Sequence, residues 1–157
     1  YRTADLEGVF LVICATDDEQ LNGLVSRDAQ RLNKLCNIAD RPDVCNFIIP
    51  SVVRRGDLVV AISTSGKSPA LAKKLRKELE NNFGEEYDDF LHLMGIIRKK
   101  LLAHGKQPEY YKPLFEKLVN SELLEMIKNK NIKGVDLLLR RSLGEGFECD
   151  NLINQND

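Results

Sequence analysis

Several patterns that would assign a function directly are missing from this sequence. No apolar run approaches the roughly 18 residues that a membrane-spanning helix needs. The net charge is −1, so the chain lacks the broad positive field of a general nucleic-acid-binding protein. Two histidines and four cysteines without a CxxC pair give no basis for a preformed zinc site. We therefore expect no membrane span, no nucleic-acid partner and no resident metal.

The cysteines show no disulfide pattern. They are Cys14, Cys36, Cys45 and Cys149. A chain of 157 residues can bury a core of its own, so it does not need disulfides for stability. We expect reduced thiols, three of them in the core and Cys149 in a polar tail. No signal peptide precedes the first strand-like segment, and these features together favour a cytoplasmic location.

The first part of the chain has the pattern of a β-α-β unit. Residues 8–15 form a continuous apolar run, typical of a strand buried on both faces of a parallel sheet. Thr16 and Glu19 have the spacing of a capping box, which predicts an amphipathic helix over residues 17–35 with Thr16 as its N-cap. Residues 36–39 have the pattern of a second buried strand. A right-handed crossover would make the two strands parallel.

A hairpin and then helices follow. Residues 47–53 and 58–63 are β-rich runs joined by a turn, which predicts an antiparallel pair of strands. Ser68 and Pro69 suit an N-cap and a first helical position, so a helix should begin there. From about residue 83 the apolar spacing is helical throughout. The predicted fold class is α/β: a partial Rossmann-type parallel sheet, a β-hairpin with a helix, and a small helical domain.

Four segments, taken in order, resemble one family. They are Leu6–Asp18, Asn37–Phe47, Ile49–Leu58 and Ile62–Pro69. Together they resemble the precorrin-2 dehydrogenases of siroheme synthesis, a family that includes the N-terminal half of siroheme synthase and stand-alone enzymes, some of which also insert iron. The resemblance implies NAD-dependent conversion of precorrin-2, a tetrapyrrole, to sirohydrochlorin, with Fe²⁺ as a further substrate wherever iron is inserted.

The resemblance, which covers residues 3–105, and the sequence pattern beyond it divide the chain into parts, and the resemblance implies a homodimer. The expected parts are the C-terminal portion of an NAD-binding Rossmann-like domain (1–48), a dimerising hairpin and helix (49–82), a helical domain (83–143) and a flexible tail (144–157). One family feature is absent. The ten glycines include no GxGxxG, the turn that cradles the NAD pyrophosphate. The segment Tyr1–Leu6 corresponds to the part of the family fold that follows that turn.

Asp40 is the candidate catalytic residue. It follows the second predicted strand, at the carboxyl edge where open α/β sheets bind ligands. The resemblance places the family's essential acidic residue at this position. The conversion of precorrin-2 removes a hydride and a proton, and a carboxylate can accept the proton. The alternative is that Asp40 only caps the turn before Pro42.

Two further groups are candidate binding residues. The resemblance assigns Ala15, Thr16 and Asp17 to contact with NAD, while the alternative is that Thr16 and Asp17 simply cap the next helix. The second group precedes a helix N-terminus, whose free amides favour anions. It could bind the carboxylates of the tetrapyrrole, or it could be a solvated surface with an ordinary N-cap. Its members are Arg41, Ser65, Gly66, Lys67 and Ser68.

Two other functions compete with the dehydrogenase hypothesis. One is a non-catalytic interaction or regulatory module that has lost the cofactor loop. The other is a different Rossmann-type oxidoreductase. Titration with NAD⁺ separates the dehydrogenase from the module, and an absorbance assay for sirohydrochlorin separates it from the other oxidoreductases.

Overall fold

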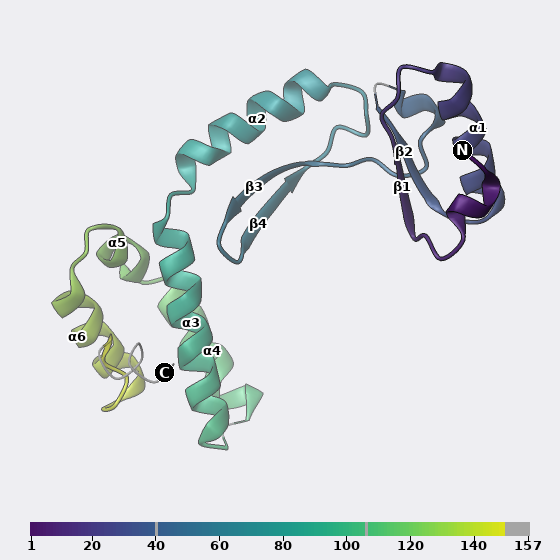
Figure 1. The fold of residues 1–157 in the computed structure, drawn as a ribbon. Helices are drawn as coiled ribbons and strands as arrows, with labels where there is room; N and C mark the ends of the chain where they lie inside the picture. The colour runs from purple at the N-terminus through teal and green to yellow at the C-terminus, as the bar shows by residue number, and fades with distance from the viewer. Residues whose placement is uncertain (40, 106, 150–157) are drawn as a thin grey trace. The chain divides into compact units, whose positions relative to one another are not determined.

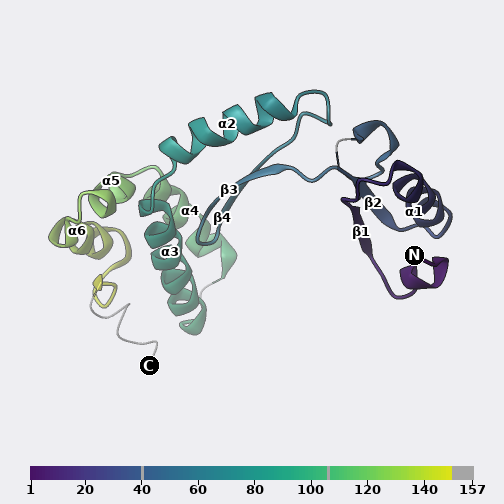
Figure 2. The same ribbon diagram turned by 45° about the horizontal axis from the view of Figure 1, so that its top comes forward.

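The computed structural model describes residues 1–39, 41–105 and 107–149. Within these residues the chain forms two compact units. One consists of residues 1–53 and 61–79, and the other of residues 54–60 and the chain from residue 80 onward. Each unit contains its own cluster of buried apolar side chains. Figures 1 and 2 show the elements in two views.

The first unit begins with the predicted β-α-β arrangement. β1 (Leu11–Cys14) and β2 (Leu35–Ile38) are parallel neighbours, and α1 (Glu19–Arg31) connects them (Figure 1). Cys14 lies opposite Ile38, so the carboxyl ends of the two strands are level. The side chains buried between the sheet and its neighbours are Leu6, Cys14, Val25, Ala29, Cys36 and Ile38.

The helix α1 begins later than the capping-box pattern predicts. Asp18, not Thr16, is its N-cap, and Asp18 Oδ1 accepts hydrogen bonds from the N–H groups of Gln20 at 2.9 Å and Leu21 at 3.0 Å. A carboxylate satisfies two free amides and also interacts favourably with the helix dipole, which a threonine hydroxyl does not. At its other end α1 stops before Asn33, whose φ of +53° is a left-handed conformation that asparagine tolerates.

The prediction that the first strand is buried on both faces is wrong. Phe10 is 80% exposed and Ile13 is 56% exposed, whereas Cys14 is buried. Successive side chains of a strand point to opposite faces. Within the described residues this sheet has two strands, and α1 packs against one face. The face that carries Ile13 therefore stays open.

The predicted hairpin and its following helix are confirmed. β3 (Ser51–Arg55) and β4 (Leu58–Ile62) form a two-stranded sheet, and the turn between them places Gly56 at a φ of +51°, which glycine adopts without strain. α2 (Pro69–Asn82) begins where predicted, because Ser68 Oγ accepts a hydrogen bond from the Leu71 N–H at 3.3 Å. Val53 is buried, but Val59 is 46% exposed.

The second unit is largely helical, as predicted. α5 packs against α3 and α6, and α4 packs against α5 and α6. Cys149, which the sequence assigns to the tail, is buried in the core of this unit. The remainder of the predicted tail, residues 150–157, lies outside the described residues. The helices are α3 (Glu86–Ala103), α4 (Pro108–Val119), α5 (Leu123–Lys128) and α6 (Ile132–Leu143).

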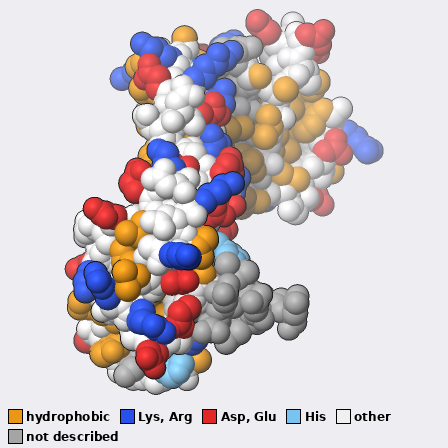
Figure 3. Space-filling view, turned by 90° about the vertical axis from the view of Figure 1, so that its left-hand side faces the viewer, with side chains coloured by type: hydrophobic (Ala, Val, Ile, Leu, Met, Phe, Trp, Pro, Cys, Tyr) orange, Lys and Arg blue, Asp and Glu red, His pale blue; other side chains and the backbone are white. Residues whose placement is uncertain are grey.

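The surface of the helical unit is mixed in character. Figure 3 shows Lys and Arg side chains interspersed with Asp and Glu, with smaller apolar areas between them. Ile132 and Leu137 are exposed apolar side chains of α6. In the part of the chain that the structure describes, no helix combines the length and the apolar character that crossing a membrane requires.

Candidate functional site

The first group of candidate binding residues lies at the carboxyl edge of the β1–β2 sheet. Ala15, Thr16 and Asp17 directly follow β1, and all three are exposed. The Ala39 N–H donates a hydrogen bond to the Cys14 carbonyl at 2.9 Å. The residue that precedes Asp40 is therefore held to the end of β1. Asp40 itself, the candidate catalytic residue, lies outside the described residues.

Thr16 is held in place by Asn22 of α1, a residue that the sequence analysis did not select. Thr16 Oγ1 donates to Asn22 Oδ1 at 2.8 Å, and Asn22 Nδ2 donates back to the Thr16 carbonyl at 2.9 Å. Asn22 is buried, and a buried amide is costly unless it is hydrogen-bonded. A polar residue on the buried face of an amphipathic helix was the available signal for this role.

Arg41 forms a two-pronged ion pair within its own turn. Arg41 Nε donates to Asp43 Oδ1 at 3.1 Å, and Arg41 Nη2 donates to Asp43 Oδ2 at 3.0 Å. The hydrogen bonds from Arg41 hold the pKa of Asp43 below its usual range, and the same bonds raise the pKa of Arg41. Both side chains are exposed, so an anionic ligand would compete with Asp43 for the guanidinium group.

The other members of the second group, residues 65–68, lie beside the turn that contains Arg41 and Pro42. Gly66 has a φ of +76°, and a Cβ built on it would lie 2.4 Å from Pro42 Cβ. The loop that contains Ser65 and Gly66 therefore packs directly on the turn that follows Asp40. Ser65 also adopts a left-handed conformation, with a φ of +53°. Only glycine fits the closest point of this contact.

Hydrogen bonds within this loop use several of the amides that the sequence analysis offered to an anion. The Lys67 N–H donates to the Thr64 carbonyl at 3.0 Å, and the Ser68 N–H donates to Thr64 Oγ1 at 3.2 Å. The Ser65 N–H donates to Ser63 Oγ at 3.2 Å. Anion binding at this loop would therefore depend on the Lys67 ammonium group more than on these amides.

Side chains close the outer edge of β2. Asn46 Oδ1 accepts from the Cys36 N–H at 2.6 Å, and Asn46 Nδ2 donates to the Lys34 carbonyl at 2.9 Å. The Asn46 and Phe47 N–H groups both donate to the Cys36 carbonyl. Asn37 Nδ2 donates to the Phe47 carbonyl at 2.9 Å. The segment after the Asp40 turn is thus fixed alongside β2 without being a strand.

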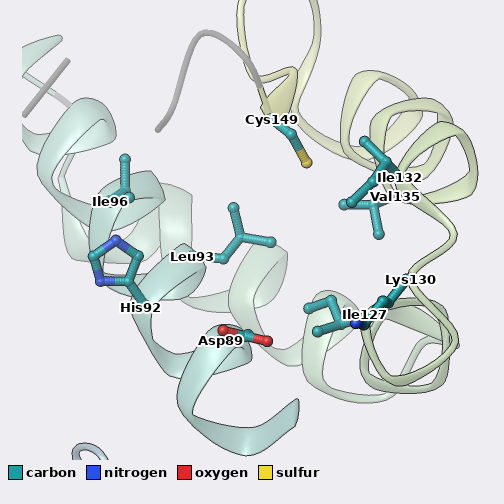
Figure 4. Close-up of a pocket in the computed structure, with 9 residues that line it drawn as sticks. All are labelled: Asp89, His92, Leu93, Ile96, Ile127, Lys130, Ile132, Val135 and Cys149. Carbon is teal, nitrogen blue, oxygen red and sulfur yellow. The ribbon is translucent and has the colours of Figure 1, made fainter. Parts of the chain in front are cut away.

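A small cavity adjoins the candidate residues, and a larger one lies in the helical unit. A cavity of about 60 Å³ adjoins Arg41 at the start of α1, and it is too small for a dinucleotide or a tetrapyrrole. The helical unit contains a cavity of about 280 Å³ between α3, α5 and α6, with aliphatic walls and Asp89, His92 and Lys130 among its lining residues (Figure 4). None of the candidate residues lines this second cavity.

The described residues contain no group of three or more histidine, cysteine, aspartate or glutamate side chains arranged to hold a metal ion. All four cysteines are free thiols. Burial raises the pKa of the Cys14 thiol to about 11, so it stays protonated at neutral pH. The chemistry that the sheet edge offers is therefore that of carboxylates, the guanidinium group of Arg41, an exposed lysine and hydroxyl groups.

Comparisons with known proteins agree with this arrangement. A family model described as putative NAD(P)-binding matches residues 1–51, and one described as the central part of a sirohaem biosynthesis protein matches residues 55–82. The siroheme synthase of Citrobacter koseri is 33% identical over 147 residues, which cover 91% of this chain and 32% of that protein. The siroheme synthase of Methylobacillus flagellatus is 35% identical over 128 residues, which cover 79% of this chain and 27% of that protein.

A solved structure has the same fold. It is the structure of SirC, a precorrin-2 dehydrogenase, which matches 87% of this chain and 68% of its own with a TM-score of 0.58 and 24% sequence identity. A parallel β-α-β unit is typical of Rossmann-type folds, and the family model over residues 1–51 is that of a putative NAD(P)-binding domain. The chain belongs to the family of siroheme synthases and precorrin-2 dehydrogenases. It spans about a third of the length of the curated relatives it matches.

Proposed function

We propose that this chain is part of a precorrin-2 dehydrogenase, which uses NAD to oxidise precorrin-2 to sirohydrochlorin in siroheme synthesis. The observation that carries the proposal is a series of contacts between described residues at one sheet edge. Residues 15–17 follow β1, Ala39 is bonded to the end of β1, and Gly66 packs on Pro42. The siroheme synthases that this chain resembles support the choice of substrate.

The exposed end of β1 fits a nicotinamide cofactor. Ala15 has a small side chain that permits close approach, and Asn22 fixes the neighbouring Thr16. When bound, the nicotinamide supplies the acceptor for the hydride. Asp17 is an exposed acidic residue beside Thr16. Because a carboxylate here would repel a further phosphate group, we favour NAD over NADP.

The tetrapyrrole would bind on the other side of the same edge. Its carboxylates would contact Arg41 and Lys67, with Ser65, Gly66 and Ser68 forming the floor of the contact. Arg41 must exchange Asp43 for the substrate, because its guanidinium group is already paired. Asp40 would accept the proton that leaves the macrocycle.

The test uses the full-length protein. We expect purified protein to bind NAD⁺ in a titration and to form sirohydrochlorin, followed by its absorbance. Asp40→Ala should abolish turnover while the circular dichroism spectrum and the melting temperature stay as in the wild type. Asp57→Asn, at an exposed aspartate of the hairpin turn, is the matched control and should keep full activity. NAD⁺ binding with no turnover would favour another oxidoreductase, and no NAD⁺ binding would favour the non-catalytic module.

Three finer statements belong to the same proposal. Iron insertion would be a second activity at this edge, with Fe²⁺ entering as a substrate, and Asp40→Ala should remove it together with the dehydrogenase activity. The protein would act as a homodimer, in accord with the exposed apolar side chains of the hairpin. It would act in the cytoplasm, where its free cysteines stay reduced.

A further inference from the structure

The cavity in the helical unit combines an aliphatic interior with charged side chains. Its volume is about 280 Å³, and its walls come from α3, the end of α5, the start of α6 and Cys149 (Figure 4). The two family models match residues 1–51 and 55–82, so neither covers this cavity. An apolar pocket with a few polar groups is the usual form of a small-molecule site. The aliphatic side chains that line it are Leu93, Ile96, Ile127, Ile132 and Val135.

The aliphatic lining is not fully covered by the protein. Leu93 and Val135 are buried, whereas Ile132 is 53% exposed although it lines the same cavity. Covering such a side chain with an apolar group is favourable, because it removes apolar surface from water. An apolar cavity of about 150 Å³ is enough to hold benzene. At about 280 Å³ this cavity fits a ligand of about ten non-hydrogen atoms, far smaller than a tetrapyrrole.

Two side chains of opposite charge line the same cavity. Asp89 lies in the first turn of α3, Lys130 lies between α5 and α6, and both are exposed. In the view of Figure 4 both lie at the end of the cavity that faces away from Cys149. Among the residues that the structure describes, neither side chain takes part in a hydrogen bond or an ion pair. A carboxylate and an ammonium group thus border one cavity without pairing with each other.

The backbone at Lys130 is fixed, so its side chain starts from a defined point. The Lys130 N–H donates to the Ile127 carbonyl at 2.9 Å, and Lys130 has a φ of +53°. The neighbouring Lys128 is placed differently, because its Nζ lies 3.9 Å from Glu86 Oε1 of α3. Lys128 does not line the cavity. Lys130 is therefore the lysine of this turn that serves the cavity.

We propose that this cavity binds an α-amino acid with an aliphatic side chain, of the size of leucine. The side chain would fill the aliphatic interior, the ammonium group would contact Asp89, and the carboxylate would contact Lys130. A fatty acid would leave Asp89 without a partner, and an alkylamine would leave Lys130 without one, whereas a zwitterion pairs with both. His92, three residues after Asp89 on α3, adds a hydrogen-bonding side chain to the wall. This binding does not depend on the proposed dehydrogenase function.

The test is a calorimetric titration of the full-length protein with L-leucine. Two analogues of the same shape are the matched ligand controls: isocaproate, which lacks the amino group, and isoamylamine, which lacks the carboxylate. We expect L-leucine to bind and each analogue to bind about fivefold or more weakly, because each loses one ionic contact. In NMR spectra of the methyl groups, L-leucine should shift the resonances of Ile96, Ile127 and Ile132, which line the cavity.

Variants of the two charged residues locate the site. Asp89→Asn and Lys130→Met should each weaken the binding of L-leucine by about fivefold or more. Glu125→Gln and Lys128→Met are the matched controls, because they remove exposed charges of α5 that do not line the cavity, and both should bind L-leucine as the wild type does. All four positions are exposed, so the melting temperatures should stay close to that of the wild type.

Several results would overturn the proposal. They are a failure of L-leucine to bind, equal binding of either analogue, and an equal loss of affinity in the control variants. L-leucine that binds only after residues 150–157 are removed would also overturn it, because the end of the chain would then be the occupant. The absorbance assay for sirohydrochlorin tests the proposed function separately, so a failure of one proposal is distinguishable from a failure of the other.

Discussion

Asp28 is the acceptor that fixes the beginning of the described chain. Tyr1 Oη donates to Asp28 Oδ2 at 3.1 Å, and Thr3 Oγ1 donates to the same oxygen at 2.8 Å. The hydrogen bond from Thr3 is the main reason that the pKa of Asp28 lies below its usual range. Its folded pKa is lower than its unfolded pKa. Its stabilising effect is therefore present at neutral pH and is lost as the pH falls below about 4 and through the folded pKa.

Asp28→Asn should lower the stability at pH 7 and flatten the dependence of stability on pH between about 5 and 2, because the neutral amide does not titrate. Urea unfolding at several pH values measures both effects. Asp57→Asn serves as the control for a lost charge. Identical pH dependence in Asp28→Asn and the wild type would show that these hydrogen bonds do not contribute.

Gly66 and Gly95 should respond oppositely to alanine. At Gly66 the φ of +76° and the short approach to Pro42 leave no room for a Cβ. Gly66→Ala should therefore cost more than about 1 kcal/mol and raise the KM for the tetrapyrrole. Gly95 lies inside α3 with no atom within 4 Å of a built Cβ, so Gly95→Ala should stabilise by about 0.5–1 kcal/mol. Thermal melts and steady-state kinetics distinguish the two, and a neutral Gly66→Ala would argue against the loop contact.

Residue roles were predictable from the sequence only where they depend on near neighbours. Ser68 as an N-cap needs only the residues that follow it, and the structure confirms it. Cys45 bonds to residues that folding brings to it, so no local pattern selects it. Asn22 gives only an indirect signal, as a polar residue on the buried face of a helix. Thr16 was mistaken for the N-cap because Asp18, two residues later, competes for the same amides and binds them better.

At the scale of elements, α6 supplies a clear contrast between its two faces. Leu139 is 0% exposed in the helical core, whereas Leu137 is 51% exposed. Leu139→Ala should destabilise the helical unit by about 2–5 kcal/mol, because it removes buried methyl groups and leaves a cavity. Leu137→Ala should change stability by less than about 0.5 kcal/mol. Guanidinium unfolding gives both values, and similar losses in the two variants would contradict the assignment of the core.

The elements themselves were largely predictable, because helical spacing and strand composition are local properties. The β-α-β order, the hairpin and the series of helices from residue 83 are all present. The burial of β1 was not predictable in the same way. An apolar run indicates that a strand can be covered on both faces, but only the neighbouring elements decide whether it is, and Ile13 remains exposed.

At the scale of the whole molecule, the hairpin and α2 bear on the proposed homodimer. Val59 of β4 is 46% exposed. If β4 forms the dimer contact, Val59→Glu should shift the protein toward the monomer, because it places a charge in an apolar interface. Leu137→Glu, at an equally exposed position of α6, should leave the assembly unchanged. Sedimentation equilibrium measures both, and a monomeric wild type would exclude the contact.

The residues bonded to the outer edge of β2 determine the edge at which the small sheet can accept a further strand. The outward-facing groups of Lys34, Cys36 and Ile38 are already bonded to Asn46, Phe47, Arg41 or Cys45. An additional strand can pair with this edge of β2 only if several of these bonds break. The edge is therefore protected against unwanted pairing with other chains. Any further strand of this sheet must therefore pair with β1, the strand at its other edge. An asparagine and a cysteine thus help to decide the side from which a larger nucleotide-binding sheet can be assembled.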